Sequence, residues 1–235
     1  MGYEGYNILI CDDDKAIVDA VGIYLSGEGY SVYKAYDGAQ VFDIIQKEQI
    51  HLVLLDIMMP VMDGLEVTKM IREQSGIPII FMSAKAQDED KIQGLQIGAD
   101  DYITKPFNPR ELVARVNSMV RRYTKLGAMP ADEANSYRTG GLVISDDKKK
   151  VTVDGRDVRL TPLEYNILLF LVKNQGKVYT INEIYENIWN EEAFGADNTV
   201  AVHIRHIREK IEVNPKNPQY LKVVWGWGYK VEKYE

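Results

Sequence analysis

The chain contains very little cysteine, since Cys11 is the single one among 235 residues. One cysteine excludes an internal disulfide framework and a zinc site built from cysteines, and it favours a reducing compartment. No apolar stretch reaches the roughly 18 residues that a membrane-spanning helix requires. The first residues also lack the basic stretch and long apolar run of a signal peptide. We therefore expect a cytoplasmic protein that has no membrane partner.

An excess of basic residues is also missing, because the formal net charge is −7. Residues 1–124 contain 12 Lys and Arg against 19 Asp and Glu, whereas residues 125–235 contain 16 of each kind. An acidic first half and a balanced second half indicate two domains with different partners. Binding to nucleic acid therefore cannot be inferred from the net charge and has to come from the placement of particular residues.

The first half alternates short apolar runs with segments of helical period, which predicts five strand–helix units. Such units form a parallel, doubly wound sheet with helices on both faces, so the fold class is α/β. The predicted strands are 7–11, 31–35, 52–56, 77–83 and 101–104, and the later helices are 88–97 and one that starts at Pro109. Cys11 lies inside the first strand, where we expect a small buried side chain.

Reactive side chains stand where the predicted strands end. Asp12 and Asp13 follow the first strand, and Asp56, Ser83 and Lys105 mark the ends of the third, fourth and fifth. The carboxyl ends of parallel strands meet at one edge of a sheet, so these groups should converge. Three converging carboxylates repel each other unless a cation is present, and Mg²⁺ prefers oxygen ligands. A carboxylate that attacks phosphorus, next to a lysine and a hydroxyl, suits phosphoryl transfer.

Four motifs carry a family resemblance: ICDDD, LLDIMMPVMDG, FMSAK and ADDYITKPF. Over residues 5–123 they resemble the receiver domain of bacterial two-component response regulators. The resemblance implies a flavodoxin-like (βα)5 fold with strand order 2-1-3-4-5, and a receiver domain over residues 1–123. It implies that Asp56 accepts the phosphoryl group, that Ser83 and Lys105 contact it, and that Tyr102 is the switch aromatic. The implied Mg²⁺ ligands are Asp12, Asp13, Asp56 and the backbone carbonyl of Met58.

Two other chemistries of this fold are disfavoured by particular residues. A phosphatase of the haloacid dehalogenase type needs a second aspartate two positions after its nucleophile, and Met58 stands there. A flavodoxin needs a hydroxyl-rich loop after the first strand to hold a phosphate. The aspartates at 12–14 would repel a phosphate that lacks a metal.

One charged surface of this domain has two interpretations. It is made by residues 88–97, the strand at Asp101 and the helix that starts at Pro109. Such charges usually form only a solvated face. The resemblance narrows, however, to the OmpR/PhoB family, in which this face forms a symmetric dimer and every pair occurs twice. The implied cross-subunit pairs are Lys91 with Glu111, Asp101 with Arg115, and Asp100 with Arg122. The family also commonly has a cis bond before the proline at the position of Pro106.

Residues 124–137 lack periodicity and predict a flexible linker, which leaves a second domain over residues 138–235. The runs at 142–145 and 151–158 predict a strand meander with a hairpin turn at 154–155. Thr161 with Glu164, and Thr180 with Glu183, predict two capping boxes that each start a helix.

A third helix follows the acidic loop at 190–197, and it carries a narrow apolar stripe at helical spacing: Val200, Ile204, Ile207 and Ile211. The opposite face is predicted to carry Val202, Arg205, His206 and Glu209, with His203 and Arg208 on the flanks. Such a face can read base edges and hold phosphates, although an ordinary amphipathic surface helix would look similar. The candidate DNA contacts are Thr199, Val202, His203, Arg205, His206 and Arg208.

The last residues, YLKVVWGWGYKVEKY, predict two strands around a glycine turn. Three helices and a hairpin form a winged helix-turn-helix, and LTPLEYNILLFL, NTVAVHIRHIREKI and WGWGYKV resemble the OmpR/PhoB effector domain. HIRHIREK and the wing look most like the VanR branch of that family. Many members have Arg where His206 and Trp225 stand, so base readout and minor-groove contact are open here. The alternative for Trp225 is packing at the base of the wing, and Tyr229 is expected to pack or, at most, to contact phosphate.

We therefore expect a DNA-binding transcription factor that a sensor histidine kinase phosphorylates at Asp56 in the presence of Mg²⁺. The expected partners are the kinase, double-stranded promoter DNA, RNA polymerase and a second copy of the chain upon phosphorylation. The half-sites should lie about one helical turn, ~10 bp, apart. The receiver would catalyse only its own phosphorylation and dephosphorylation. The alternatives are a regulator that binds DNA independently of phosphorylation, and an aspartyl-phosphate phosphatase.

Overall fold

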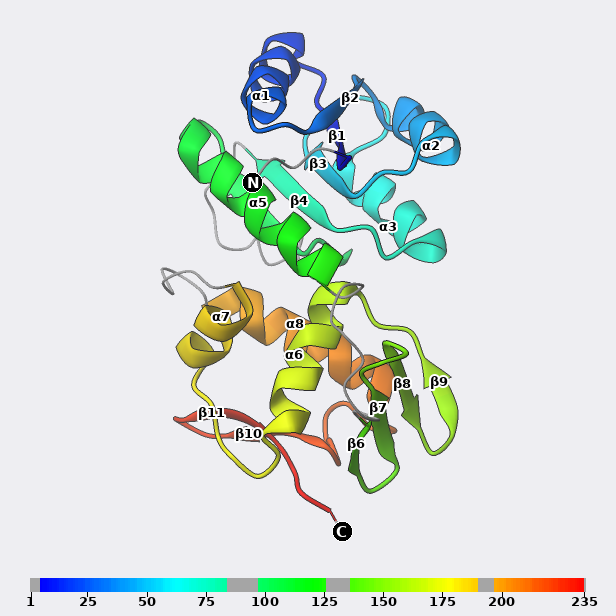
Figure 1. Cartoon of the computed structure of the whole chain (residues 1–235), viewed down its shortest axis with the longest axis vertical. Helices are drawn as coiled ribbons and strands as arrows, with labels where there is room; N and C mark the ends of the chain where they lie inside the picture. The colour runs from blue at the N-terminus through cyan, green and yellow to red at the C-terminus, as the bar shows by residue number, and fades with distance from the viewer. Residues whose placement is uncertain (1–4, 84–96, 126–135, 190–196, 235) are drawn as a thin grey trace. The chain divides into compact units, whose positions relative to one another are not determined.

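The computed structural model describes residues 5–83, 97–125, 136–189 and 197–234, with the side chains of residues 122–125 and 197–198 excluded. The chain divides into two compact units, Met1–Tyr123 and Thr124–Glu235, and each is considered by itself (Figure 1). Among the helices of the described ranges, none combines the length and the apolar character needed to cross a bilayer.

The first unit is built on a five-stranded parallel sheet. Its strands are β1 (Asn7–Cys11), β2 (Ser31–Ala35), β3 (Leu52–Asp56), β4 (Ile79–Ser83) and β5 (Asp101–Thr104). They lie in the order β2-β1-β3-β4-β5, which confirms the expected topology. The third and fourth strands are buried at every position because helices cover both faces of the sheet.

Four described helices flank this sheet: α1 (Lys15–Gly27), α2 (Gly38–Lys47), α3 (Gly64–Gln74) and α5 (Pro109–Lys125). Figure 1 shows α1 and α5 on one face and α2 and α3 on the other. Asp14, Asp37 and Asp63 cap α1, α2 and α3 by accepting backbone N–H groups of the first turn. The helix expected over residues 88–97 falls almost wholly outside the described residues.

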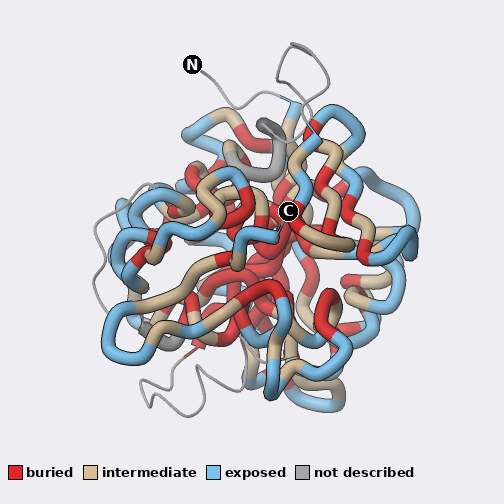
Figure 2. Tube along the Cα trace, turned by 90° about the horizontal axis from the view of Figure 1, so that it is seen from below, coloured by how far each residue is buried: buried red, intermediate tan, exposed pale blue. Residues whose placement is uncertain are grey.

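The packing of the core of the first unit follows the two-residue period of the strands. Ile8, Ile10 and Leu54 pack against residues of α1 and α5 in one buried cluster, and the intervening Leu9 and Leu55 are also fully buried. Buried stretches, red in Figure 2, alternate with exposed ones along the chain, as expected for elements that each cover one face. This sandwich leaves the carboxyl ends of the strands as the edge available for chemistry.

The second unit begins with an antiparallel sheet in the order β6-β7-β8-β9. Its strands are β6 (Ser136–Thr139), β7 (Leu142–Ser145), β8 (Lys150–Val153) and β9 (Arg156–Val158). Asp154 and Gly155 both have positive φ and form the predicted turn between β8 and β9. The sequence analysis missed β6, and Ser136 and Tyr137, placed in the predicted linker, belong to this strand.

Three helices and a hairpin complete the second unit: α6 (Pro162–Lys173), α7 (Ile181–Trp189), α8 (Asp197–Ile211), β10 (Leu221–Val224) and β11 (Gly228–Val231). Both predicted capping boxes form. Thr161 and Glu164 bond reciprocally at the start of α6, and Thr180 and Glu183 do so at the start of α7. The apolar stripe of α8 lies inside the core, with Val200 and Ile207 fully buried. The unit is a winged helix-turn-helix, as predicted.

Candidate phosphoacceptor and DNA-binding sites

The carboxylates at the strand ends of the first unit converge as predicted. One oxygen from each of Asp12, Asp13 and Asp56 lies within 4.8 Å of the other two. Asp12 and Asp56 are 1% and 4% exposed, and Asp13 opens to solvent. Three oxygen donors of this kind, two buried and one accessible, fit a hard divalent cation such as Mg²⁺.

Lys105 reaches into this cluster from the end of β5. Its Nζ donates to Asp12 Oδ2 at 2.6 Å and lies 3.0 Å from Asp56 Oδ1. Burial raises the pKa of Asp56, the ion pair with Lys105 opposes that rise, and the carboxylate of Asp12 adds to it. Burial by itself would lower the pKa of Lys105, but Asp12 and Asp56 outweigh burial and raise it. One ammonium group therefore pairs with two of the three carboxylates.

Glycine is required beside the cluster at a position that the sequence analysis did not single out. A Cβ on Gly64 would lie 2.2 Å from the backbone carbonyl oxygen of Asp56. The N–H of Gly64 also donates to the carbonyl oxygen of Ile57 at 3.0 Å. The Asp-Gly pair in the motif LLDIMMPVMDG was the available signal, because glycine often marks a close approach of two backbones.

The remaining expected receiver residues lie around the same edge of the sheet. Ser83 is buried at the end of β4, and its carbonyl oxygen accepts the N–H of Lys105 at 2.7 Å. Tyr102 is half-buried in β5, and the side chain of Met58 is 56% exposed. The Lys105–Pro106 peptide bond is cis, which agrees with the resemblance.

Cys11 is a buried thiol at the end of β1. It is fully buried, and its Sγ lies 3.3 Å from Sδ of Met59. Burial, reinforced by the neighbouring carboxylates, raises the pKa of the thiol to about 12. The thiol is therefore protonated at neutral pH, which agrees with a packing role.

The charged groups expected at a dimer interface are paired within one chain. Arg115 lies 3.0 Å from Asp101 and 3.1 Å from Glu111, and Asp100 pairs with Arg72 at 2.7 Å. Cross-subunit pairs would require these side chains to exchange partners. Their other expected partners, Lys91 and the side chain of Arg122, lie outside the described residues.

The surface of α8 differs in part from the helical-wheel prediction. Arg205 and Glu209 are exposed, as predicted, and they pair with each other at 2.9 Å. Val202, predicted to face outward, is 6% exposed, and Thr199 and His203 are 3% and 2% exposed. The helical-wheel prediction assumed one buried stripe on α8. These residues are buried because α8 packs against both α6 and α7. For His203 the neighbour is Trp189, with a ring-centroid distance of 6.0 Å.

His206 is half-buried beside an acidic residue of α6 that sequence reasoning used only as a cap. Its Nδ1 lies 3.9 Å from Oε1 of Glu164. Glu164 is 2% exposed and accepts hydrogen bonds from Lys210 Nζ and from the N–H of Thr161. This carboxylate therefore connects the start of α6 to the C-terminal part of α8.

Arg208 connects α8 to the wing. Its Nε donates to the carbonyl oxygen of Leu221 at 2.8 Å, and its guanidinium lies 5.8 Å from the ring of Tyr229. Burial lowers the pKa of this arginine. Arg208 thus holds the hairpin β10–β11 against α8, in addition to its expected role as a DNA contact. Tyr229 packs against the core of the unit, as predicted.

Trp225 does not pack at the base of the wing, because its side chain is 86% exposed. The reason is the hairpin turn: the carbonyl oxygen of Val224 accepts the N–H of Trp227 at 2.9 Å, and Gly226 has a φ of +76°. Trp225 therefore lies at the tip of the hairpin, beyond the last paired residues of β10 and β11. Trp227 is likewise 72% exposed.

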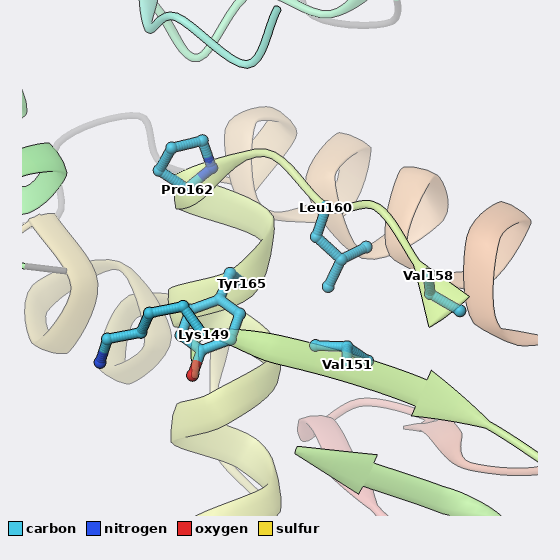
Figure 3. Close-up of a pocket in the computed structure, with 6 residues that line it drawn as sticks. All are labelled: Lys149, Val151, Val158, Leu160, Pro162 and Tyr165. Carbon is cyan, nitrogen blue, oxygen red and sulfur yellow. The ribbon is translucent and has the colours of Figure 1, made fainter. Parts of the chain in front are cut away.

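A hollow of about 150 Å³ lies between β8, β9 and α6 (Figure 3). Its lining residues are Lys149, Val151, Val158, Leu160, Pro162 and Tyr165. Binding pockets for small molecules typically measure ~300–1,000 Å³ and combine apolar walls with several converging polar groups. Lys149 is the single charged residue of this lining, and it is already paired with Asp146 at 2.7 Å. The hollow has the character of a packing defect.

Comparisons with known proteins agree with this pair of domains. The family model of the response regulator receiver domain matches residues 8–117, and that of the C-terminal domain of transcriptional regulatory proteins matches residues 155–231. The chain is 44% identical to the regulatory protein VanR of Enterococcus faecium and 41% identical to VanRc of Enterococcus gallinarum. Each match spans 96% of this chain and 98% of the relative.

A solved structure extends the comparison. The response regulator DrrB of Thermotoga maritima, an OmpR/PhoB homologue, is 34% identical, with 97% of this chain and 99% of that chain covered and a TM-score of 0.51. The fold and the two domains thus define a two-component response regulator that acts in transcription. The chain belongs to the OmpR/PhoB family of response regulators.

Proposed function

We propose that phosphorylation of Asp56 by a sensor histidine kinase controls how this regulator binds promoter DNA. The observation that carries the proposal is the convergence of Asp12, Asp13 and Asp56 within 4.8 Å, beside the ammonium group of Lys105. A bound Mg²⁺ would offset the charge of the carboxylates and of the phosphoryl oxygens. Its ligands would be the three aspartates and the backbone carbonyl of Met58.

The residues of the chain divide the work of phosphoryl transfer. An oxygen of Asp56 forms a bond to phosphorus while the bond between phosphorus and the histidine nitrogen of the kinase breaks. Lys105 pairs with the transferred group, and the hydroxyl of Ser83 donates a hydrogen bond to it. The new dianion adds roughly −1.5 to −2 charge, and Ser83 moves toward it while Tyr102 turns into the space that Ser83 leaves.

We infer that this change alters the face made by β5 and α5 so that two copies associate. In one chain Arg115 pairs with both Asp101 and Glu111. On association Arg115 would pair with Asp101 of the second copy, Glu111 with Lys91, and Asp100 with Arg122. A two-fold arrangement doubles every such contact. The dimer would place two winged helices on half-sites ~10 bp apart and present RNA polymerase with a defined surface.

A phosphoryl mimic tests the proposal directly. The full chain is incubated with beryllofluoride and Mg²⁺, and its oligomeric state and its affinity for duplex DNA are measured by ultracentrifugation and fluorescence anisotropy. We expect dimer formation and tighter binding. If beryllofluoride changes neither quantity, the switch is absent and the chain binds DNA independently of phosphorylation. Sustained release of phosphate from unrelated phosphoesters would instead indicate a phosphatase.

A further inference from the structure

A small charged cluster joins the start of α6 to the C-terminal part of α8, and the proposed mechanism does not use it. Nζ of Lys210 donates to both carboxylate oxygens of the buried Glu164, at 2.8 Å to Oε1 and 2.6 Å to Oε2. The same Oε1 lies 3.9 Å from Nδ1 of His206. This distance is too long for a hydrogen bond but is short enough for an ion pair with a protonated imidazole.

His206 lies at the boundary between the buried and the exposed faces of α8. Its side chain is 12% exposed, whereas the side chain of the preceding Arg205 is 60% exposed. The following residue, Ile207, is fully buried in the core of the unit. The imidazole thus has the carboxylate of Glu164 on its protein side and borders the surface that a ligand of α8 would cover.

Titratable groups face this imidazole from both helices that surround it. Glu164 comes from α6, whereas Lys210 and His203 belong to α8 itself, with 6.3 Å between the ring centroids of His203 and His206. The contribution of α7 is Trp189, an indole that does not titrate and that lies against His203. Lys210 already offsets the charge of Glu164, so a proton on His206 gives this set a net positive charge.

We propose that α8 takes up a proton at His206 when it binds DNA, and that Glu164 is the positioning residue that holds the resulting imidazolium. The proposal rests on the DNA-binding role of the second unit. The proton comes from the solvent, because imidazole is the side chain whose charge changes most readily between about pH 5 and pH 8.

The chemistry of the imidazolium explains why the two events are coupled. Both of its ring nitrogens are donors. Nδ1–H can therefore donate to Oε1 of Glu164 while Nε2–H donates to an acceptor of the DNA, which is either a guanine edge or a phosphate oxygen. The added charge also attracts the polyanion. Acidification should therefore tighten DNA binding.

The pH dependence of DNA binding tests the coupling. Fluorescence anisotropy of the full chain is measured from pH 6 to pH 8 on two duplexes. One duplex is enriched by the wild-type chain from a random-sequence pool, and the other is a mixed-sequence duplex of equal length. We expect the affinity to rise about tenfold as the pH falls from 8 to 6. Uptake of a single proton limits the slope of log affinity against pH to about one.

The source of the proton can be assigned because the chain has three histidines. His206→Gln cannot take up a proton, so its affinity should be the same at pH 6 and pH 8 and no higher than that of wild type at pH 8. His206→Arg carries a permanent charge and should bind more tightly than His206→Gln, again without pH dependence. His51→Gln, in the receiver, is the matched control and should keep the wild-type dependence.

A third variant tests the role of Glu164. Glu164→Gln keeps the shape of the side chain and removes the counter-ion, so it should reduce the rise in affinity between pH 8 and pH 6. Circular dichroism should report an unchanged fold. A purely structural residue would change the affinity by the same factor at every pH, and this result would contradict the positioning role.

Calorimetry in two buffers of different ionisation enthalpy counts the protons directly. We expect DNA binding at pH 7 to take up a measurable fraction of a proton per chain, and His206→Gln to take up none. The two duplexes distinguish the acceptors. A larger pH response on the enriched duplex assigns the contact to a base edge, and equal responses assign it to a phosphate oxygen; both results support the coupling.

The proposal is overturned if the wild-type affinity is constant from pH 6 to pH 8, or if His206→Gln keeps the wild-type dependence. These outcomes differ from a failure of the phosphorylation switch. That failure would appear as an affinity that beryllofluoride changes at no pH. Each variant is compared with wild type in the same phosphorylation state, so the two proposals are tested separately.

Discussion

The two units of this regulator both bury carboxylates, but they balance them differently. In the receiver, Asp12, Asp13 and Asp56 lie together, and Lys105 pairs with two of them, Asp12 and Asp56. Burial, with a smaller contribution from the charge of Asp12, raises the pKa of Asp56 although Lys105 opposes the rise. A cluster that is short of positive charge at neutral pH is suited to attract a cation and then to accept a phosphoryl group.

In the DNA-binding unit, the buried carboxylates Glu164 and Asp146 are each surrounded by several hydrogen-bond donors. Glu164 accepts from Lys210 and from the N–H of Thr161. Asp146 accepts from Lys149, Lys173 and Tyr165, and these hydrogen bonds overcome burial and lower its pKa to about 2. A buried carboxylate thus indicates a reactive site when nearby cations and hydrogen-bond donors do not offset its charge. It indicates a structural role when several donors surround it.

The largest expected effect removes the receiver's function altogether. Asp56→Asn keeps the shape of the side chain and deletes the nucleophilic charge, so the variant should show no change of oligomeric state with beryllofluoride and Mg²⁺. Circular dichroism should report an unchanged fold. Asp43→Asn, at a residue of α2 away from the cluster, is the matched control and should respond as wild type does. A wild-type response by Asp56→Asn would assign the phosphoryl group to another residue.

The next largest effect concerns stability. Glu164→Ala leaves the N–H of Thr161 without its cap and Lys210 without its counter-ion, so it should lower the free energy of unfolding of the second unit by about 3 kcal/mol. Urea denaturation followed by Trp189 fluorescence measures this change. Glu209→Ala, which removes an exposed pair with Arg205, should cost less than about 0.5 kcal/mol. Similar losses for both variants would contradict the structural role of Glu164.

The contribution of the structural carboxylate Asp146 to stability depends on pH. Its pKa is about 2 in the folded protein and near 3.8 when unfolded. The stability that it contributes is therefore fully present above about pH 4 and is lost as the pH falls toward 2. Asp146→Asn should lower the free energy of unfolding by about 2 kcal/mol at pH 7. The difference between variant and wild type should decrease in that acidic window. A constant difference at all pH values would show that packing, and not charge, explains the loss.

Sequence reasoning succeeded where one local pattern decides the outcome. The apolar run that ends at Asp56 has to be a strand covered on both faces, so the acidic edge followed from the topology. The capping boxes at Thr161 and Thr180 formed as predicted because they depend on residues only three positions apart.

Sequence reasoning failed where contacts between distant parts of the chain determine the structure. The strand β6 carries few apolar residues and is recognisable only beside β7. The burial of His203 depends on Trp189 of another helix, and Arg208 bonds to a carbonyl 13 residues away. The exposure of Trp225 depends on a turn geometry that its own residue type does not reveal. The role of Gly64 depends on a backbone contact with Asp56.

A smaller effect should have the opposite sign in the receiver. Because three carboxylates lie together there and one ammonium group pairs with two of them, removing one charge relieves repulsion. In buffer without divalent cations, Asp56→Asn should raise the free energy of unfolding of the receiver by about 1 kcal/mol. Thermal denaturation with and without Mg²⁺ provides the measurement, and added Mg²⁺ should stabilise wild type more than the variant. If the variant is destabilised, Asp56 has a structural role, as the buried carboxylates of the second unit do.

The smallest expected effect concerns backbone strain, which the wing and the loop after the phosphoacceptor treat differently. The wing places glycine at its left-handed positions, including Gly226, whereas the loop after the phosphoacceptor places Val61 at a φ of +72°. A β-branched residue is unfavourable there, and Val61 is fully exposed, so packing does not compensate. Val61→Asn should therefore raise the free energy of unfolding of the receiver by about 0.5 kcal/mol, measured by urea denaturation. Val213→Asn, equally exposed but without a positive φ, should leave stability unchanged. If Val61→Asn is neutral or destabilising, the side chain has a stabilising contact that outweighs the strain.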